Sequence, residues 1–175
     1  MRELCVTAVG KDRPGIVAAL TEPLLALGGN LEDCRAALLR GSFAVVLAVA
    51  VGDGVSPADV EAALAPAAGR LGLTLAVGPA EPQADEPPGE RCVVSVYGAD
   101  RPGIVHAVSA GIAAFGGNIV DLSSRVVGDP ALYVLGIEVV LPEGATSGEL
   151  RAALAPVAAA RGLELAVQDE ADEVL

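Results

Sequence analysis

The sequence is poor in aromatic residues, with two Phe, two Tyr and no Trp among 175 residues. Proteins that bind single-stranded nucleic acids stack bases on aromatic side chains, so this scarcity argues against such a function. Basic residues are also few, because 11 Lys and Arg stand against 23 Asp and Glu and the formal net charge is −12. A phosphate backbone would repel such a chain, so we expect no direct contact with nucleic acid.

Long apolar runs are also missing, and cysteine is rare. No stretch approaches the roughly 18 apolar residues of a membrane helix, and the N-terminus does not read as a secretory signal, so we expect no membrane association and a cytoplasmic location. Cysteine occurs three times, at Cys5, Cys34 and Cys92, in apolar segments without a Cys-x-x-Cys pair. We expect buried, reduced thiols rather than a metal or redox site.

The chain does contain an internal repeat. Residues 10–17, Gly-Lys-Asp-Arg-Pro-Gly-Ile-Val, return as residues 98–105 with a single difference, Ala99 in place of Lys11. Each copy follows an apolar run typical of a strand and precedes a run with helical spacing. A strand-to-helix turn presents backbone N–H groups and the positive end of a helix dipole, a combination that suits a carboxylate.

The first copy of this motif opens a series of predicted elements. Composition and periodicity predict a strand at 4–9, a helix at 14–27 with Pro14 in its first turn, strands at 31–39, 43–51 and 73–77, and a second helix from 57. Residues 28–30, Gly-Gly-Asn, are typical of a helix end, and 40–42 of a tight reversal. We expect Pro23 to bend or break the first helix and Pro66 to kink or restart the second. The strand 43–51 is apolar on both faces and therefore central.

The second copy repeats this order. We expect a strand at 92–97, a helix at 102–115, Gly-Gly-Asn at 116–118, strands at 132–141 and 162–167, and a capping box formed by Thr146 and Glu149. The domains are predicted at 1–77 and 91–168, joined by a Pro-rich acidic linker at 78–90 and followed by an acidic tail at 169–175. The order βαββαβ predicts an α+β fold of two ferredoxin-like domains, each a four-stranded antiparallel sheet with two helices on one face.

Eight acidic residues lie in the linker and the tail: Glu81, Asp85, Glu86, Glu90, Asp169, Glu170, Asp172 and Glu173. Solvation explains them most simply, and docking to a partner is the alternative.

The motif and the Gly-Gly-Asn that follows each helix resemble the signature of ACT domains, the regulatory amino-acid-binding modules of metabolic enzymes. Two such domains in tandem resemble the glycine cleavage system transcriptional repressor family. The resemblance implies domains that pair side by side, within a chain and in a homodimer, with an amino acid bound where they meet. It implies these ligand contacts: Lys11, Asp12, Arg13, Pro14, Gly15, Ile16 and Asn30, and Ala99, Asp100, Arg101, Pro102, Gly103, Ile104 and Asn118. An Asn amide can bind both an ammonium and a carboxylate.

Catalytic machinery is not evident in the sequence. We recognise no nucleophile with its base, no paired carboxylates in a cleft and no set of metal ligands. We therefore expect no enzyme, catalytic residue, metal or cofactor. The leading hypothesis is an amino-acid sensor that acts through a regulatory protein partner on amino-acid or glycine metabolism. The alternative is a ligand-independent interaction module whose motifs are structural, and an enzyme would require an unrecognised site.

The two copies differ beside the motif. The single histidine, His106, stands where the first copy has Ala18. It either senses ligand or pH or is a surface or interface residue without chemistry. This difference and that between Lys11 and Ala99 indicate that the two sites need not bind alike.

Overall fold

The computed structural model describes residues 1–80 and 89–170. The chain divides into two compact units, Met1–Ala84 and Asp85–Leu175, here called unit 1 and unit 2. Most of the predicted linker and tail, with Glu81, Asp85, Glu86, Asp172 and Glu173, lies outside the described residues. The domain limits derived from the sequence stay predictions.

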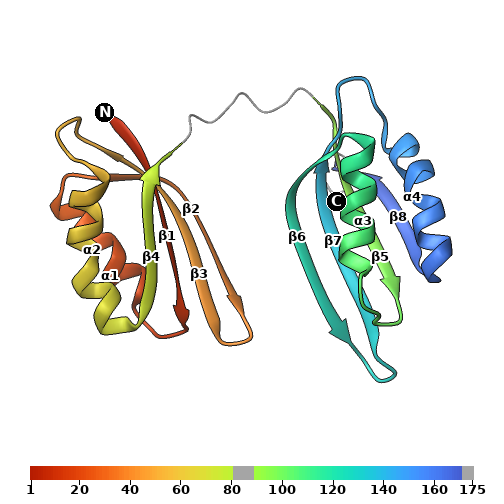
Figure 1. Cartoon of the computed structure of the whole chain (residues 1–175), viewed down its shortest axis with the longest axis horizontal. Helices are drawn as coiled ribbons and strands as arrows, with labels where there is room; N and C mark the ends of the chain where they lie inside the picture. The colour runs from red at the N-terminus through yellow and green to blue at the C-terminus, as the bar shows by residue number, and fades with distance from the viewer. Residues whose placement is uncertain (81–88, 171–175) are drawn as a thin grey trace. The chain divides into compact units, whose positions relative to one another are not determined.

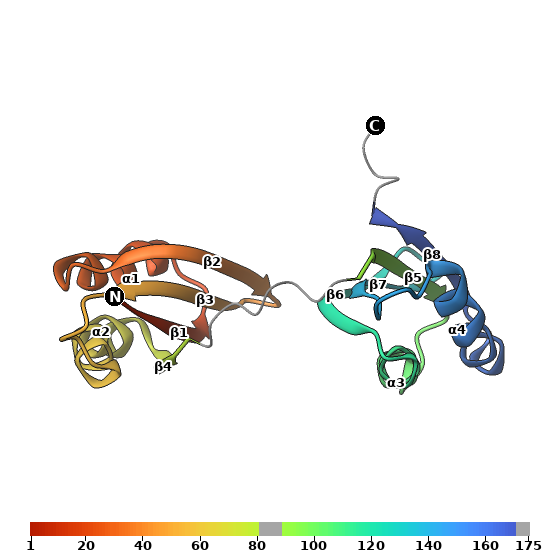
Figure 2. The same cartoon turned by 90° about the horizontal axis from the view of Figure 1, so that it is seen from above.

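Each unit is a sheet covered on one side by two helices (Figures 1 and 2). Unit 1 contains β1 (Arg2–Lys11), α1 (Ile16–Ala26), β2 (Asn30–Leu39), β3 (Ser42–Val51), α2 (Pro57–Leu71) and β4 (Leu73–Pro79). Unit 2 contains β5 (Arg91–Gly98), α3 (Ile104–Phe115), β6 (Asn118–Val127), β7 (Leu132–Val140), α4 (Ser147–Arg161) and β8 (Glu164–Asp169). The antiparallel strand orders are β2-β3-β1-β4 and β6-β7-β5-β8. The predicted ferredoxin-like α+β fold is confirmed.

The core of each unit lies between its sheet and its helices. In β1 the alternate residues Leu4, Val6 and Ala8 are buried, as a strand with one covered face requires. Helix α1 contributes buried residues at every fourth position, beginning with Ile16. The apolar strand β3 lies inside the sheet between β2 and β1, so its predicted central position is confirmed.

Helix α1 differs from its prediction at the start. It begins at Ile16 rather than Pro14, because Gly15 has a left-handed backbone (φ 87°) that cannot belong to the helix. Pro23 does not break α1, which continues to Ala26, and Pro66 does not restart α2, which runs unbroken from Pro57 to Leu71. Neighbouring hydrogen bonds and core packing therefore outweigh the donor that each proline removes.

The predicted reversal at 40–42 is a two-residue turn in which both Arg40 (φ 49°) and Gly41 (φ 80°) are left-handed. Positive φ at both central residues matches the twist of the two strands that the turn joins. The turn lies at the end of the sheet where β1 also ends, since Lys11 is paired with Ser42.

Candidate functional site

The two motif turns share one backbone geometry. Gly15 (φ 87°) and Gly103 (φ 85°) directly precede α1 and α3, and neither turn has a side-chain cap. The first helical hydrogen bonds run from Ala19 N–H to Gly15 O (2.9 Å) and from Ala107 N–H to Gly103 O (3.0 Å). The N–H groups of the three residues before Ala19 and before Ala107 therefore point out of the helix end. They are donors suited to a carboxylate.

Helices α2 and α4 begin in a different way. Ser56 and Asp59 form a reciprocal capping box at α2 (Ser56 N–H to Asp59 Oδ2, 2.9 Å), and Thr146 and Glu149 form the predicted box at α4 (Thr146 N–H to Glu149 Oε2, 2.9 Å). Hydrogen bonds from the side chain and the backbone of Ser56 hold the pKa of Asp59 below its ordinary value. Those from the backbone and the side chain of Thr146 do the same for the pKa of Glu149. Of the four helices in the described ranges, only α1 and α3 present an open N-terminus.

The side chains of the predicted site are exposed, with one exception in each unit. Residues 11–15 and 99–103 are accessible to solvent, whereas Ile16 and Ile104 are each only 2% exposed and belong to the cores. Each isoleucine can therefore offer a ligand its N–H group and not its side chain.

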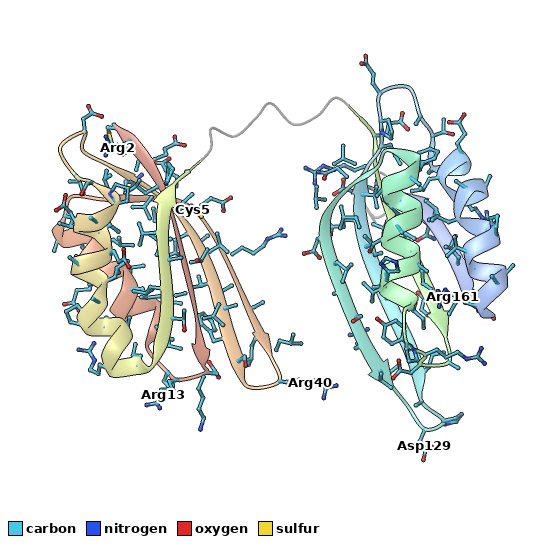
Figure 3. All side chains as sticks on the ribbon, in the orientation of Figure 1. Arg2, Cys5, Arg13, Arg40, Asp129 and Arg161 are labelled. Atoms are coloured by element: carbon cyan, nitrogen blue, oxygen red, sulfur yellow. The ribbon has the colours of Figure 1, made fainter. Side chains whose placement is uncertain are left out.

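The two motif loops are held by different contacts. In unit 1 the Asp12 N–H donates to the carbonyl of Gly41 (2.9 Å), so the loop is tied to the β2–β3 hairpin. Figure 3 shows Arg13 and Arg40 at the same end of this unit. In unit 2 the Arg161 guanidinium, at the end of α4, donates to the carbonyl of Pro102 (3.5 Å). Sequence reasoning missed Arg161, although aligning the two repeats places it opposite Leu71 and would have marked the difference.

Asn30 and Asn118 lie far from the motif of their own unit. Asn30 is paired with Ala50 of β3, whereas Lys11 is paired with Ser42, eight residues earlier on the same strand. Eight residues of an extended strand span about 27 Å. Asn118 occupies the corresponding position beside Val140 of β7. No single unit can bring its Asn and its motif onto the same small ligand.

An apolar groove of about 460 Å³ lies beside Asn30, between α1 and β2. Its lining residues are Ala18, Thr21, Glu22, Leu24, Leu25, Gly29, Asn30, Leu31 and Val49. Leu25 is 74% exposed, and every residue of the edge strand β2 is exposed. Groove and strand edge together form a surface on which another domain could pack.

The cysteines were predicted to be buried, and this is wrong for Cys34. Cys34 lies on the exposed edge strand β2, and Cys5 is half-buried. Cys92 is buried, and its burial, with a smaller contribution from Asp169, raises the pKa of its thiol to about 11. All three are free thiols. His106 is exposed in the first turn of α3.

Within the two described ranges, no group of three or more His, Cys, Asp and Glu side chains is placed to hold a metal ion. A helix long and apolar enough to cross a membrane is likewise not found in this part of the chain.

Curated proteins with similar sequences are found in bacteria and archaea. Phosphoserine phosphatase SerB2 of Mycobacterium tuberculosis is 31% identical over 94% of this chain and 40% of its own length. The glycine cleavage system transcriptional repressor of Escherichia coli is 30% identical over 70% of this chain and 64% of its own length. UPF0237 protein MK1213 of Methanopyrus kandleri is 41% identical over 46% of this chain and 88% of its own length. The chain thus spans less than two thirds of the phosphatase and of the repressor.

Solved structures share the fold over nearly the whole chain. An unknown protein from Galdieria sulphuraria has a TM-score of 0.82 at 27% identity, covering 96% of this chain and 98% of its own. A putative glycine cleavage system transcriptional repressor has a TM-score of 0.73 at 19% identity, covering 96% of both chains, and shows the fold alone. The sequence model of the ACT domain matches residues 2–78 and 90–168. The chain therefore belongs to the ACT domain family, as a tandem of two such domains.

Proposed function

We propose that this chain is an amino-acid-binding regulatory protein and not an enzyme. The observation that carries the proposal is the open, uncapped N-terminus of α1 and α3, present in both units at the motif that resembles the ACT signature. A carboxylate would accept hydrogen bonds from these N–H groups and interact favourably with the helix dipole. Residues 11–16 and 99–104 would form the wall of the two sites.

The other half of each site has to come from another ACT domain. Asn30 lies about 27 Å along the sheet from its own motif, so it would bind a ligand held by a different domain. The exposed edge strand β2 and the groove beside it would receive that domain. We propose that a second copy of the chain supplies it, in a homodimer whose two-fold symmetry repeats the contact.

The similarity to phosphoserine phosphatase does not transfer that enzyme's activity. The ACT model accounts for most of this chain, so the 40% of the phosphatase that it matches corresponds to ACT domain sequence. The repressor relative supports a regulatory role. We propose that a protein partner receives the signal. An acidic chain is poorly suited to contact DNA itself. We place the protein in the cytoplasm, which cell fractionation would check.

Calorimetric titration of the full chain with the common amino acids, glycine and serine first, tests the proposal. Saturable binding with a Kd in the micromolar to millimolar range is expected. A panel without binding in this range would refute a sensor of free amino acids.

A ligand-independent interaction module is the second candidate, favoured by the exposed apolar surface around Leu25 and β2. The double variant Asn30→Ala/Asn118→Ala separates the two functions, because it removes polar groups without altering the motif turns. In a sensor this variant loses the response to amino acid. In an interaction module it keeps full affinity for the partner, and no amino acid changes that affinity.

A further inference from the structure

The motif of unit 2 has a neighbour that the motif of unit 1 lacks. A Cβ placed on Gly103 would lie 3.5 Å from Nη1 and 3.8 Å from Nη2 of Arg161, whereas a Cβ on Gly15 would meet nothing within 4 Å. Arg161 is half-buried and donates from Nη1 to the Pro102 carbonyl (3.5 Å). Figure 3 shows its side chain beside α3. The guanidinium therefore stands against the last residues of the turn. Its only hydrogen bond within the described residues is the one to Pro102, and its other N–H groups remain as donors.

The position of this arginine is not explained by the dipole of its own helix. Helices α2 and α4 each carry one basic residue in the last turn, Arg70 and Arg161 respectively. A positive charge there interacts favourably with the negative end of the helix dipole, on whichever side of the helix it lies. The repeated runs 62–66 and 152–156 align Arg70 with Ala160 and Leu71 with Arg161. The charge has moved by one residue, which is about 100° around a helix. Arg70 is exposed, and Arg161 reaches the motif.

In unit 2, Arg161 stands where unit 1 has an apolar core contact made by Leu71. Leu71 packs against the core of unit 1, and its counterpart Arg161 cannot make an equivalent contact with its charged end. Lys11, the additional cation of the first motif, lies at the end of β1 opposite Ser42, and Ala99 replaces it in unit 2. The two motifs therefore differ in where the positive charge lies relative to the helix N-terminus.

The charged side chains of this part of unit 2 are Arg161 and the motif's own Asp100 and Arg101. Among the described residues, no carboxylate lies within ion-pair distance of Arg161. Its guanidinium lies beside the N-terminus of α3, which carries a positive partial charge from the helix dipole. Two positive groups side by side favour a ligand with more negative charge than one α-carboxylate provides.

We propose that Arg161 determines the specificity of the second motif, and that this site takes an amino acid with a negatively charged side chain. The inference rests on the proposed function, because it presumes that the motif binds amino acids. The N–H groups at the start of α3 bind one carboxylate, and Arg161 binds the other through charge-assisted hydrogen bonds. The motif of unit 1, with Leu71 in that position, lacks this second contact.

Calorimetric titration of the full chain with L-aspartate, L-glutamate, glycine and L-serine tests this assignment. The variant Arg161→Leu introduces the residue that unit 1 has at this position. The double variant Ala160→Arg/Arg161→Leu reproduces the Arg-Leu pair of unit 1 and keeps one positive charge at the end of α4. We expect both variants to lose about 10-fold or more in affinity for the acidic amino acids, as removal of a charged hydrogen bond does. Affinity for glycine and serine should change by less than about 3-fold, which is near the lower end of what one neutral hydrogen bond contributes.

Tyr97 and Tyr133, the two tyrosines, both lie in unit 2, so their fluorescence checks that each variant is folded. The assignment is overturned if Arg161→Leu binds the acidic amino acids as well as the unaltered chain does. It is also overturned if Ala160→Arg/Arg161→Leu restores their binding, because the charge would then act through the dipole of α4. Binding of glycine or serine without any binding of the acidic amino acids would refute the specificity and leave the sensor function standing. If no amino acid binds the unaltered chain, both proposals fail.

Discussion

At the scale of single residues, the motif depends on a glycine that is left-handed rather than helical. Gly103 closes the β5–α3 turn at φ 85° and starts the helix with its donors exposed. A side chain at this position is strained whatever the space around it. The glycine therefore has a backbone role that is independent of ligand binding.

The variant Gly103→Ala should lower the free energy of unfolding of unit 2 by about 1 to 2 kcal/mol, the cost of a left-handed non-glycine residue. Gly148→Ala is its matched control. Gly148 is helical, and a Cβ there would meet only Thr146 Oγ1 at 3.9 Å, so this change should stabilise by up to about 1 kcal/mol. Urea unfolding followed by tyrosine fluorescence measures both. Equal effects of the two variants would show that the turn does not require glycine.

At the scale of elements, the four helices of the described residues begin in two ways. The capping boxes of α2 and α4 satisfy their first donors internally, whereas α1 and α3 leave theirs open. Capping stabilises a helix, so the two open ends forgo stability at the position where the motif lies.

The capping box of α4 makes a pH-dependent contribution to stability. Backbone and side-chain hydrogen bonds from Thr146 hold the pKa of Glu149 below its ordinary value of 4.5. Since the folded pKa is the lower one, this contribution is present above the unfolded pKa and is lost as the pH falls through the folded pKa. The variant Glu149→Gln keeps an acceptor without the charge. It should be less stable than the unaltered chain at pH 7, and the difference should vanish in acid. A difference that stays constant from pH 7 to pH 3 would contradict this account.

The glycine within α3 sets how closely α3 and α4 approach. A Cβ on Gly111 would lie 2.6 Å from Cδ2 of Leu154, which is fully buried. Gly111→Val should therefore destabilise unit 2 by about 1 to 3 kcal/mol through overpacking. Ala110→Val, on the exposed side of the same helix, should cost less than about 1 kcal/mol.

The double variant Gly111→Val/Leu154→Ala should lose less stability than the sum of its single changes, because the smaller side chain makes room for the larger one. Thermal unfolding followed by tyrosine fluorescence measures all of these variants. Strict additivity would show that Gly111 and Leu154 do not compete for the same space.

At the scale of the whole molecule, the fold was predictable because the repeat and the apolar periodicity agree in both halves. The central position of β3 followed from its two apolar faces, and the box at Thr146 from spacing alone. The start of α1 was not predictable, because it depends on the φ angle of Gly15. The sequence Pro-Gly is compatible with both a helical and a left-handed glycine. Cys34 was misassigned because an edge strand can be apolar and still uncovered.

The site was predictable only in part. The motif marks the turn, and the helix predicted between it and Asn30 already separates the two. The register between β2 and β3 agrees, because it places Asn30 at the opposite end of the sheet. Arg161 is 58 positions from Gly103 and comes beside it only through the packing of α4. Sequence therefore located the proposed anion-binding turns and missed what surrounds them.

A backbone amide NMR titration of the full chain with an amino acid that binds tests the central claim most directly. If the open helix ends hold the carboxylate, the amide signals of Ile16, Val17 and Ala18, or of Ile104, Val105 and His106, should shift saturably and further than those of the capped starts of α2 and α4. Binding that leaves all six of these amides in place, or a panel of amino acids that moves no amide at all, would contradict the claim.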